Sequence, residues 1–177
     1  MPKLIKITTI LSIIMTYILI SHKSIAQEYE PWTGSTVGAS INFGNHETLI
    51  HIRKLINQGK IDSAVRESEK FINNLNTLSR SGKTSKYLYD AYNALCISLT
   101  ANKEYQKAEE ACNFAIKDTP NRWQAFNSRG SMNYRNGSFS SALTDYRQAL
   151  ENAPNTKHIK RIIEHNVRIS EARVSGN

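Results

Sequence analysis

The chain has 177 residues, with 23 lysines and arginines against 15 aspartates and glutamates, and its formal net charge is +8. This length is enough for one domain with a core of its own. The positive excess is mild, so it favours acidic peptides, anionic envelope polymers or lipid headgroups as partners and argues against nucleic acid.

The first 26 residues, 1–26, have the pattern of an export signal peptide. A cationic start, Met1 to Lys6, leads into an almost wholly apolar stretch, Ile7 to Ile20, and Ser24-Ile25-Ala26 offers small residues to a signal peptidase. We expect cleavage near Ala26, which leaves a periplasmic or secreted protein with a net charge of about +5. The alternative is a retained anchor, although this mainly apolar stretch of 14 residues falls short of the roughly 20 needed to span a bilayer. Membrane contact is therefore expected only through partners or transiently during export.

Residues 27–45 differ in composition from everything that follows. Gly34, Gly38 and Gly44, together with Pro31 and several serines and threonines, predict a flexible leader. One pattern within it favours a strand, because apolar residues alternate with small or polar ones at Val37, Ala39, Ile41 and Phe43. Such a strand could add to a sheet edge of a partner or pack on its own domain. The leader is thus expected to be a disordered tether, with a strand added to a partner or packed on its own domain as the alternatives.

From Glu47 onward the apolar residues follow a helical period, and several recur at an interval of 34. The recurring pairs are Ala108 and Ala142, Ala115 and Ala149, Pro120 and Pro154, Tyr92 and Phe126, and Tyr105 and Phe139. Small residues at fixed spacing indicate where two helices approach closely, and a proline closes each unit. The period predicts stacked helical hairpins, an architecture that usually binds partners and seldom does chemistry.

The last unit resembles the tetratricopeptide repeat (TPR). Its matching residues, in the order and spacing of that family, are Phe126, Gly130, Tyr134, Gly137, Phe139, Ala142, Tyr146, Ala149, Leu150 and Pro154. The unit before it matches at Tyr92, Leu95, Tyr105, Ala108, Ala115, Ile116 and Pro120. That unit departs from the family at Cys96, where a small residue is preferred. A weaker first unit matches at Leu55, Gly59, Ile61, Ala64 and Phe71.

The resemblance implies an all-α fold, a right-handed superhelical solenoid of about three TPR hairpins followed by a capping helix. The repeats span residues 46–154, with units at about 46–78, 87–120 and 121–154 and about ten extra residues between the first two. Residues 155–177 form the cap and tail, whose helix we expect to reach about Arg173. The cap places Ile159, Ile162, Ile163 and Val167 on one side. Such arrays need a terminal helix to cover an exposed apolar end.

In this family the first helices of successive units line a concave groove, and the resemblance implies which residues face it. These are Asp90, Asn93, Gln124, Asn127, Tyr134, Arg135, His158, Arg161, His165 and Arg168. The surface is polar at its centre and basic at its carboxyl-terminal end. Asparagines can pair with an extended peptide backbone, and arginines can bind carboxylates, so an acidic or free carboxyl-terminal peptide would suit it. The alternative is an ordinary solvated helix face, and Ile97 replaces one polar position of the family's chaperone-tail clamp.

Two cysteines, Cys96 and Cys112, lie about equally far from the turn near Asn102-Lys103, so they face each other across one hairpin. An even count in an exported protein makes a disulfide plausible. The competing interpretation is a pair of buried thiols, because helix axes are commonly 8–10 Å apart and the α-carbons can be too distant for a bridge.

The sequence contains no constellation that points to catalysis. Gly82-Lys83-Thr84 has Thr77 where a nucleotide-binding loop needs its first glycine, and no strand precedes it. His158 and His165 lie two helical turns apart, roughly 10 Å, too far to share a metal without other ligands. We therefore expect no enzymatic activity, no metal and no cofactor. The predicted function is an exported adaptor that binds a protein or peptide in the groove. The alternative is a structural subunit of an envelope assembly that docks through its leader or convex face.

Overall fold

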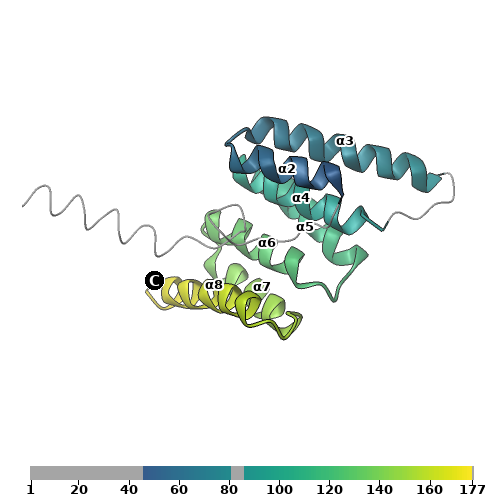
Figure 1. The fold of residues 1–177 in the computed structure, drawn as a ribbon. Helices are drawn as coiled ribbons and strands as arrows, with labels where there is room; N and C mark the ends of the chain where they lie inside the picture. Colours follow the sequence, from purple (N-terminus) through teal and green to yellow (C-terminus); the bar gives the residue numbers. More distant parts are fainter. Residues whose placement is uncertain (1–45, 81–85, 177) are drawn as a thin grey trace, which may run out of the picture. The chain divides into compact units, whose positions relative to one another are not determined.

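The computed structural model describes residues 46–80 and 86–176, and the regular elements in this part of the chain are all helices (Figure 1). They are α2 (Glu47–Asn57), α3 (Ile61–Arg80), α4 (Leu88–Ala101), α5 (Tyr105–Asp118), α6 (Trp123–Arg135), α7 (Phe139–Glu151) and α8 (Lys157–Ser175). The chain splits into two units, Met1–Glu30 and Pro31–Asn177, and every described residue belongs to the second.

Three of the sequence predictions lie outside the described residues. These are the signal peptide at 1–26, the leader at 27–45 and the Gly82-Lys83-Thr84 segment between the first two units. Among the helices that the structure does describe, none combines the length and the apolar character that a membrane crossing requires.

The helices pack in sequence order as antiparallel pairs. Helix α2 packs on α3, α4 on α5, and α6 on α7, and α8 packs on α7 at the end of the series. Neighbouring pairs are joined because α4 also contacts α2, α3 and α6. The predicted all-α fold of about three hairpins and a capping helix is therefore confirmed.

The three hairpin turns share one hydrogen-bonding pattern. Gly59, Lys103 and Gly137 have positive φ angles of 71°, 62° and 80°. The next residue donates its backbone N–H to a carbonyl five residues earlier, over 2.8–3.0 Å: Lys60 to Leu55, Glu104 to Leu99, and Ser138 to Asn133. This Schellman arrangement ends a helix with a residue in the left-handed conformation. The three turn residues are 44 and then 34 residues apart, yet all three hairpins use the same turn.

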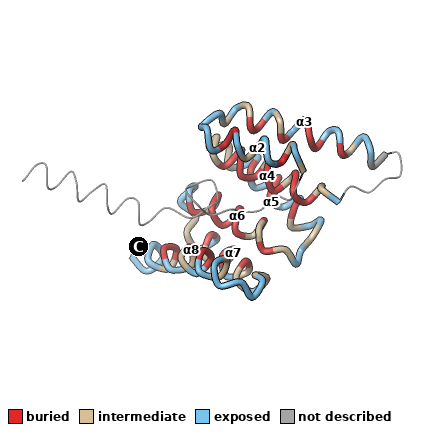
Figure 2. The backbone as a smooth tube through the Cα atoms, in the orientation of Figure 1, coloured by how far each residue is buried: buried red, intermediate tan, exposed pale blue. Residues whose placement is uncertain are grey.

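The recurring alanines occupy the contacts between paired helices. Ala64, Ala108 and Ala142 each lie five residues after the turn residue of their hairpin, and all three are 0% exposed. A methyl side chain at this point lets two helix backbones approach closely, which is why the sequence keeps it small. Figure 2 shows the buried positions running along the sides of helices that face their neighbours.

Helix α4 is the most enclosed of the described helices. Ten of its 14 residues are buried, because α2, α3, α5 and α6 all contact it. Its buried residues are apolar on several sides, but they also include Asp90, Asn93, Ser98 and Thr100. A buried polar residue normally needs a hydrogen-bond partner, so these positions are where function can be sought.

Candidate functional site

Two predicted groove residues, Asn93 on α4 and Asn127 on α6, occupy equivalent positions in successive units. They are 34 residues apart and are 1% and 0% exposed. Asn93 Oδ1 and Asn127 Nδ2 are buried without a hydrogen-bond partner among the described residues, and so is Oε1 of Gln124, one turn before Asn127. We call Asn93, Gln124 and Asn127 the amide row. It contains two acceptor oxygens and one donor nitrogen, all buried, whose hydrogen bonds are unmade.

The oxygen of the Asn127 amide already accepts a hydrogen bond. Asn166 Nδ2 on α8 donates to Asn127 Oδ1 over 2.9 Å, and both side chains are 0% exposed. Asn127 therefore helps to hold the capping helix on α6 as well as presenting its nitrogen. The sequence reasoning missed Asn166, although a polar residue on the apolar side of a cap was a signal for a buried partner.

Asp90 lies in a contact between hairpins. Its Oδ1 accepts a hydrogen bond from Arg122 Nη2 at 2.7 Å, and the guanidinium of Arg122 stands 3.8 Å from the centre of the Tyr89 ring. The Tyr89 hydroxyl accepts the backbone N–H of Ala125 at 2.8 Å. Burial raises the pKa of Asp90, while the hydrogen bond and charge of Arg122 act against that shift. The Asp90 carboxylate thus binds Arg122 and fixes the start of α6.

Tyr134 and Arg135 lie at the carboxyl-terminal end of α6. Tyr134 is 7% exposed, its ring meets Phe139 edge-on at 5.2 Å, and its hydroxyl accepts from Arg173 Nε at 3.4 Å. Arg135 is exposed. Tyr134 therefore packs where α6, α7 and α8 meet, and Arg135 lies at its rim.

The predicted residues on α8 follow one stripe of that helix. His158, Arg161, His165 and Arg168 succeed one another at spacings of three, four and three residues. His158, Arg161 and Arg168 are exposed and His165 is half-buried. Neither Arg161 nor Arg168 forms an ion pair with a described residue, so two guanidinium groups are available to a ligand on the exposed side of the cap.

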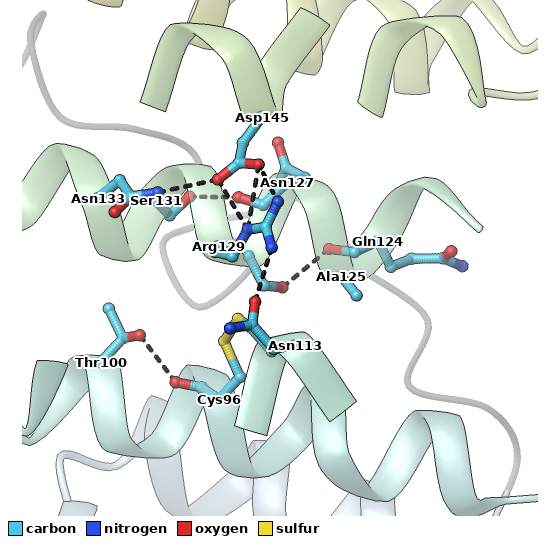
Figure 3. The surroundings of a disulfide bond; sticks show 12 residues. Cys96, Thr100, Asn113, Gln124, Ala125, Asn127, Arg129, Ser131, Asn133 and Asp145 are labelled. Carbon is cyan, nitrogen blue, oxygen red and sulfur yellow. Dashed lines mark hydrogen bonds and ion pairs between the residues drawn. A yellow bond between two sulfur atoms is a disulfide. The ribbon is translucent and has the colours of Figure 1, made fainter. Parts of the chain in front are cut away.

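Cys96 and Cys112 are joined by a disulfide that links α4 to α5 (Figure 3). Their α-carbons are 5.1 Å apart, within the range that a disulfide spans. Such an approach between two helices requires small neighbours, and Ala108 and Ala111 on α5 are 0% and 4% exposed. Both cysteines are themselves 0% exposed, so the bond belongs to the packed core of the second hairpin.

An ion-pair cluster that sequence reasoning missed lies beside this disulfide (Figure 3). Arg129 on α6 binds both carboxylate oxygens of Asp145 on α7, with a shortest distance of 2.6 Å. Its Nη1 donates to Asn113 Oδ1 on α5 at 2.6 Å, and Asn133 Nδ2 donates to Asp145 at 2.9 Å. Both Asp145 oxygens and three guanidinium nitrogens of Arg129 have protein partners, so the cluster fixes α5, α6 and α7 together.

The described residues contain no group of three or more histidine, cysteine, aspartate or glutamate side chains that could hold a metal ion. Among the predicted groove residues, the groups without a partner in the described part of the chain include the unsatisfied atoms of the buried amide row and the exposed arginines of α8. These groups can form hydrogen bonds and ion pairs.

Comparisons with known proteins bear on the fold. No protein-family model matches the sequence, and no curated protein matches it. Among solved structures, it is similar to the NMR structure of the first TPR domain of the human RPAP3 protein, with a TM-score of 0.55 and 18% sequence identity. The match covers 73% of this chain and 94% of that one. The described part of the chain therefore has the fold of a TPR domain.

Proposed function

We propose that this protein is an adaptor that binds an extended segment of a partner protein along the first helices of its hairpins. A TPR-like fold indicates a protein-protein interaction domain, and such repeat arrays act through the surfaces that they present. Fold alone gives only this class of function, so the ligand has to be argued from the side chains.

The amide row is the observation that carries the proposal. A buried polar atom without a partner costs about 1–3 kcal/mol. A ligand that enters as the neighbouring helices part, and supplies the missing bonds, recovers that free energy. An extended peptide offers N–H donors and C=O acceptors along its whole length. Asn93 Oδ1 can accept one N–H, and Asn127 Nδ2 can donate to one C=O. Their equivalent positions on α4 and α6 suit a single strand crossing both helices.

The exposed arginines of α8 suggest the composition of the ligand. Arg161 and Arg168 lie two turns apart and bear charges that no described residue neutralises. A guanidinium pairs with a carboxylate through two parallel hydrogen bonds, so acidic side chains or a terminal carboxylate would be recognised at this end. The proposed ligand is an extended acidic peptide.

We also propose that the protein works outside the cytoplasm, in the periplasm or after secretion. The signal-like pattern of residues 1–26 supports this placement. The Cys96–Cys112 bond adds support, because structural disulfides persist in oxidising compartments and are rare in the cytosol.

A second candidate is a structural subunit that docks through the second helices of its hairpins. Phe114 on α5 is 55% exposed, although its ring stacks on Tyr92 at 5.0 Å. A large aromatic side chain that remains half in water is a common anchor at protein interfaces. Replacing Phe114 by alanine should release the protein from such an assembly while leaving peptide binding unchanged.

Synthetic peptides of acidic, neutral and basic composition test the proposed function directly. We expect the full chain to retain acidic peptides, and Arg161→Ala with Arg168→Ala to weaken this binding at least about tenfold. Arg66→Ala with Lys117→Ala removes two exposed cations from α3 and α5 and is the matched control. Equal loss in both pairs would mean that only net charge matters, and no peptide binding at all would contradict the proposal.

A further inference from the structure

We propose that a second copy of this chain binds the exposed face of α5 through the arginines of its own α8. The receiving surface, which we call the aromatic patch, consists of four exposed residues of α5: Glu110, Phe114, Lys117 and Asp118. The inference goes beyond the proposed function. It assigns a partner to the surface that the second candidate function uses, and it gives Arg161 and Arg168 a second role.

The aromatic patch is centred on a ring that the repeat fold does not require. The equivalent positions of the first and third hairpins hold Lys70 and Gln148, 44 residues before Phe114 and 34 residues after it. Phe114 is nevertheless 55% exposed. One face of its ring is covered by Tyr92, with a centroid distance of 5.0 Å and 17° between the ring planes. Burial of the rest of the ring would favour association with a partner.

Acidic side chains lie one helical turn on either side of this ring. Glu110 precedes Phe114 by four residues and Asp118 follows it by four, so the three share one stripe of α5. Neither carboxylate forms an ion pair with a described residue, and Asp118 accepts a hydrogen bond from the Thr119 hydroxyl at 2.9 Å. A guanidinium group can stack on an aromatic ring and also pair with a carboxylate. The aromatic patch therefore suits a partner that presents arginines.

The exposed stripe of α8 carries such arginines at a matching spacing. Arg161 and Arg168 are seven residues apart, about 10 Å along their helix. Glu110 and Asp118 are eight residues apart, about 12 Å along α5. Two helices laid side by side can therefore form both ion pairs at once. The long arginine side chains would then cover Phe114, which lies midway between the two carboxylates.

A further pair of charges fits the same alignment. Glu164 is exposed and lies between the two arginines of α8, and Lys117 is exposed and lies between Phe114 and Asp118. An antiparallel contact that places Arg161 at Asp118 brings Arg168 to Glu110. It also brings Glu164 close to Lys117. Because like charges would meet in other registers, the alternation of sign favours this one.

The contact joins two different surfaces, so association is head-to-tail, and each bound copy keeps one further surface open. An interface between two helix faces is small, and we expect a Kd on the order of 0.1 mM. Salt should weaken it, because the ion pairs lie at the surface. An acidic peptide bound to the arginines of α8 would compete with the second copy. Ligand binding would thus separate the copies.

Charge reversal on the two helices tests the inference by sedimentation equilibrium of the full chain. One variant is Glu110→Arg with Asp118→Arg, and the other is Arg161→Glu with Arg168→Glu. We expect the wild type to self-associate at low salt, and each variant alone to do so at least about tenfold more weakly. An equimolar mixture of the two variants should associate again, because opposite charges then face each other. A wild type that stays monomeric at about 1 mM, or a mixture that stays monomeric, would overturn the inference.

Two more variants separate a specific contact from the effect of net charge. Asp62→Arg with Glu69→Arg makes the same charge change at exposed positions of α3 and should leave self-association unchanged. Phe114→Ala changes no charge and should weaken self-association about tenfold. Equal weakening by the α3 and α5 charge variants, or none by Phe114→Ala, would overturn the inference.

Failure of this inference can be told apart from failure of the proposed function. Binding of an acidic peptide is measured on dilute protein, at about 1 μM, where the copies are separate. It should depend on Arg161 and Arg168 but not on Phe114. If the peptide binds and the wild type does not self-associate, only the second-copy contact is wrong. If the wild type self-associates and no acidic peptide binds, only the proposed function is wrong.

Discussion

Gly130 on α6 lies so close to Tyr146 on α7 that a methyl group at Gly130 would be 2.7 Å from Cδ1 and Cε1 of the ring. The ring cannot move aside easily, because Tyr146 is 0% exposed and its hydroxyl donates to Ser131 Oγ at 3.1 Å. The close contact between the two helices of the third hairpin therefore requires glycine at position 130.

Gly130→Ala should destabilise the protein. Alanine favours a helix over glycine by about 1 kcal/mol, but crowding a packed core costs about 1–3 kcal/mol, and we expect the steric effect to win. Urea unfolding followed by circular dichroism measures the change. Tyr146→Leu should rescue Gly130→Ala in a double-mutant cycle, since it removes the ring. A Gly130→Ala protein as stable as the wild type would show that the helices can separate freely.

Asp145→Ala should lower the free energy of unfolding by about 3–5 kcal/mol, because it leaves the Arg129 guanidinium without its partner in a largely buried site. The Asp145 side chain is only 6% exposed. The control is Arg147→Ala, which breaks an ion pair with Glu171 whose side chains are 59% and 44% exposed. We expect less than about 1 kcal/mol there. Similar losses in both variants would contradict the structural role of the buried cluster.

Reduction of the Cys96–Cys112 bond should lower the free energy of unfolding by about 3 kcal/mol, the value for a loop of this length in the chain-entropy model. Thermal unfolding with and without dithiothreitol measures the change. The double variant Cys96→Ala with Cys112→Ala should be insensitive to the reductant. Mass spectrometry after alkylation without reduction provides the direct check, and two modified thiols would rule out the bond.

Alkaline pH should destabilise the fold through Tyr89. Burial raises the pKa of this phenol from 10.0 to about 12, so the folded state keeps a proton that the unfolded state loses first. The stabilisation is complete below pH 10 and is lost as the pH rises toward 12, by about 3 kcal/mol in total. Urea unfolding across this range measures the loss.

Tyr89→Phe is the control for the alkaline effect. It should be about 1 kcal/mol less stable at neutral pH, since the backbone N–H of Ala125 loses its acceptor. It should also lose less stability between pH 10 and 12. Burial raises the pKa of Tyr146 as well, so part of the alkaline loss should remain in this variant. An identical pH dependence in both proteins would exclude Tyr89 as a source.

Much of the fold could be predicted because its signals are local. Apolar residues at helical spacing, glycines at Gly59 and Gly137, and alanines at the close contacts repeat with the unit itself. The turn near Asn102-Lys103 was also placed correctly, although Lys103 takes the left-handed conformation without being glycine. Each of these features depends on residues within one hairpin, so the sequence pattern contains it.

Several details of the candidate site could not be predicted, because they depend on a residue from another unit. Asp90 pairs with Arg122 across 32 positions, and Asn127 with Asn166 across 39. The period places Asn93 and Asn127 on equivalent helix faces but does not say whether those faces are open, buried or paired. The repeat pattern contains only the residues that the units have in common. The hydrogen-bond partners Arg122 and Asn166 are not part of that pattern.

The sequence by itself determined the helices, their turns and the order in which they stack, because short-range periodicity and backbone conformation decide all three. Only the tertiary structure decided which polar side chains are satisfied: the Arg129 guanidinium is paired with Asp145 and Asn113, whereas Asn93 and Asn127 each keep an unmade hydrogen bond. The physical reason is that burial and pairing arise from helices brought together across more than one unit, and no local pattern contains that information.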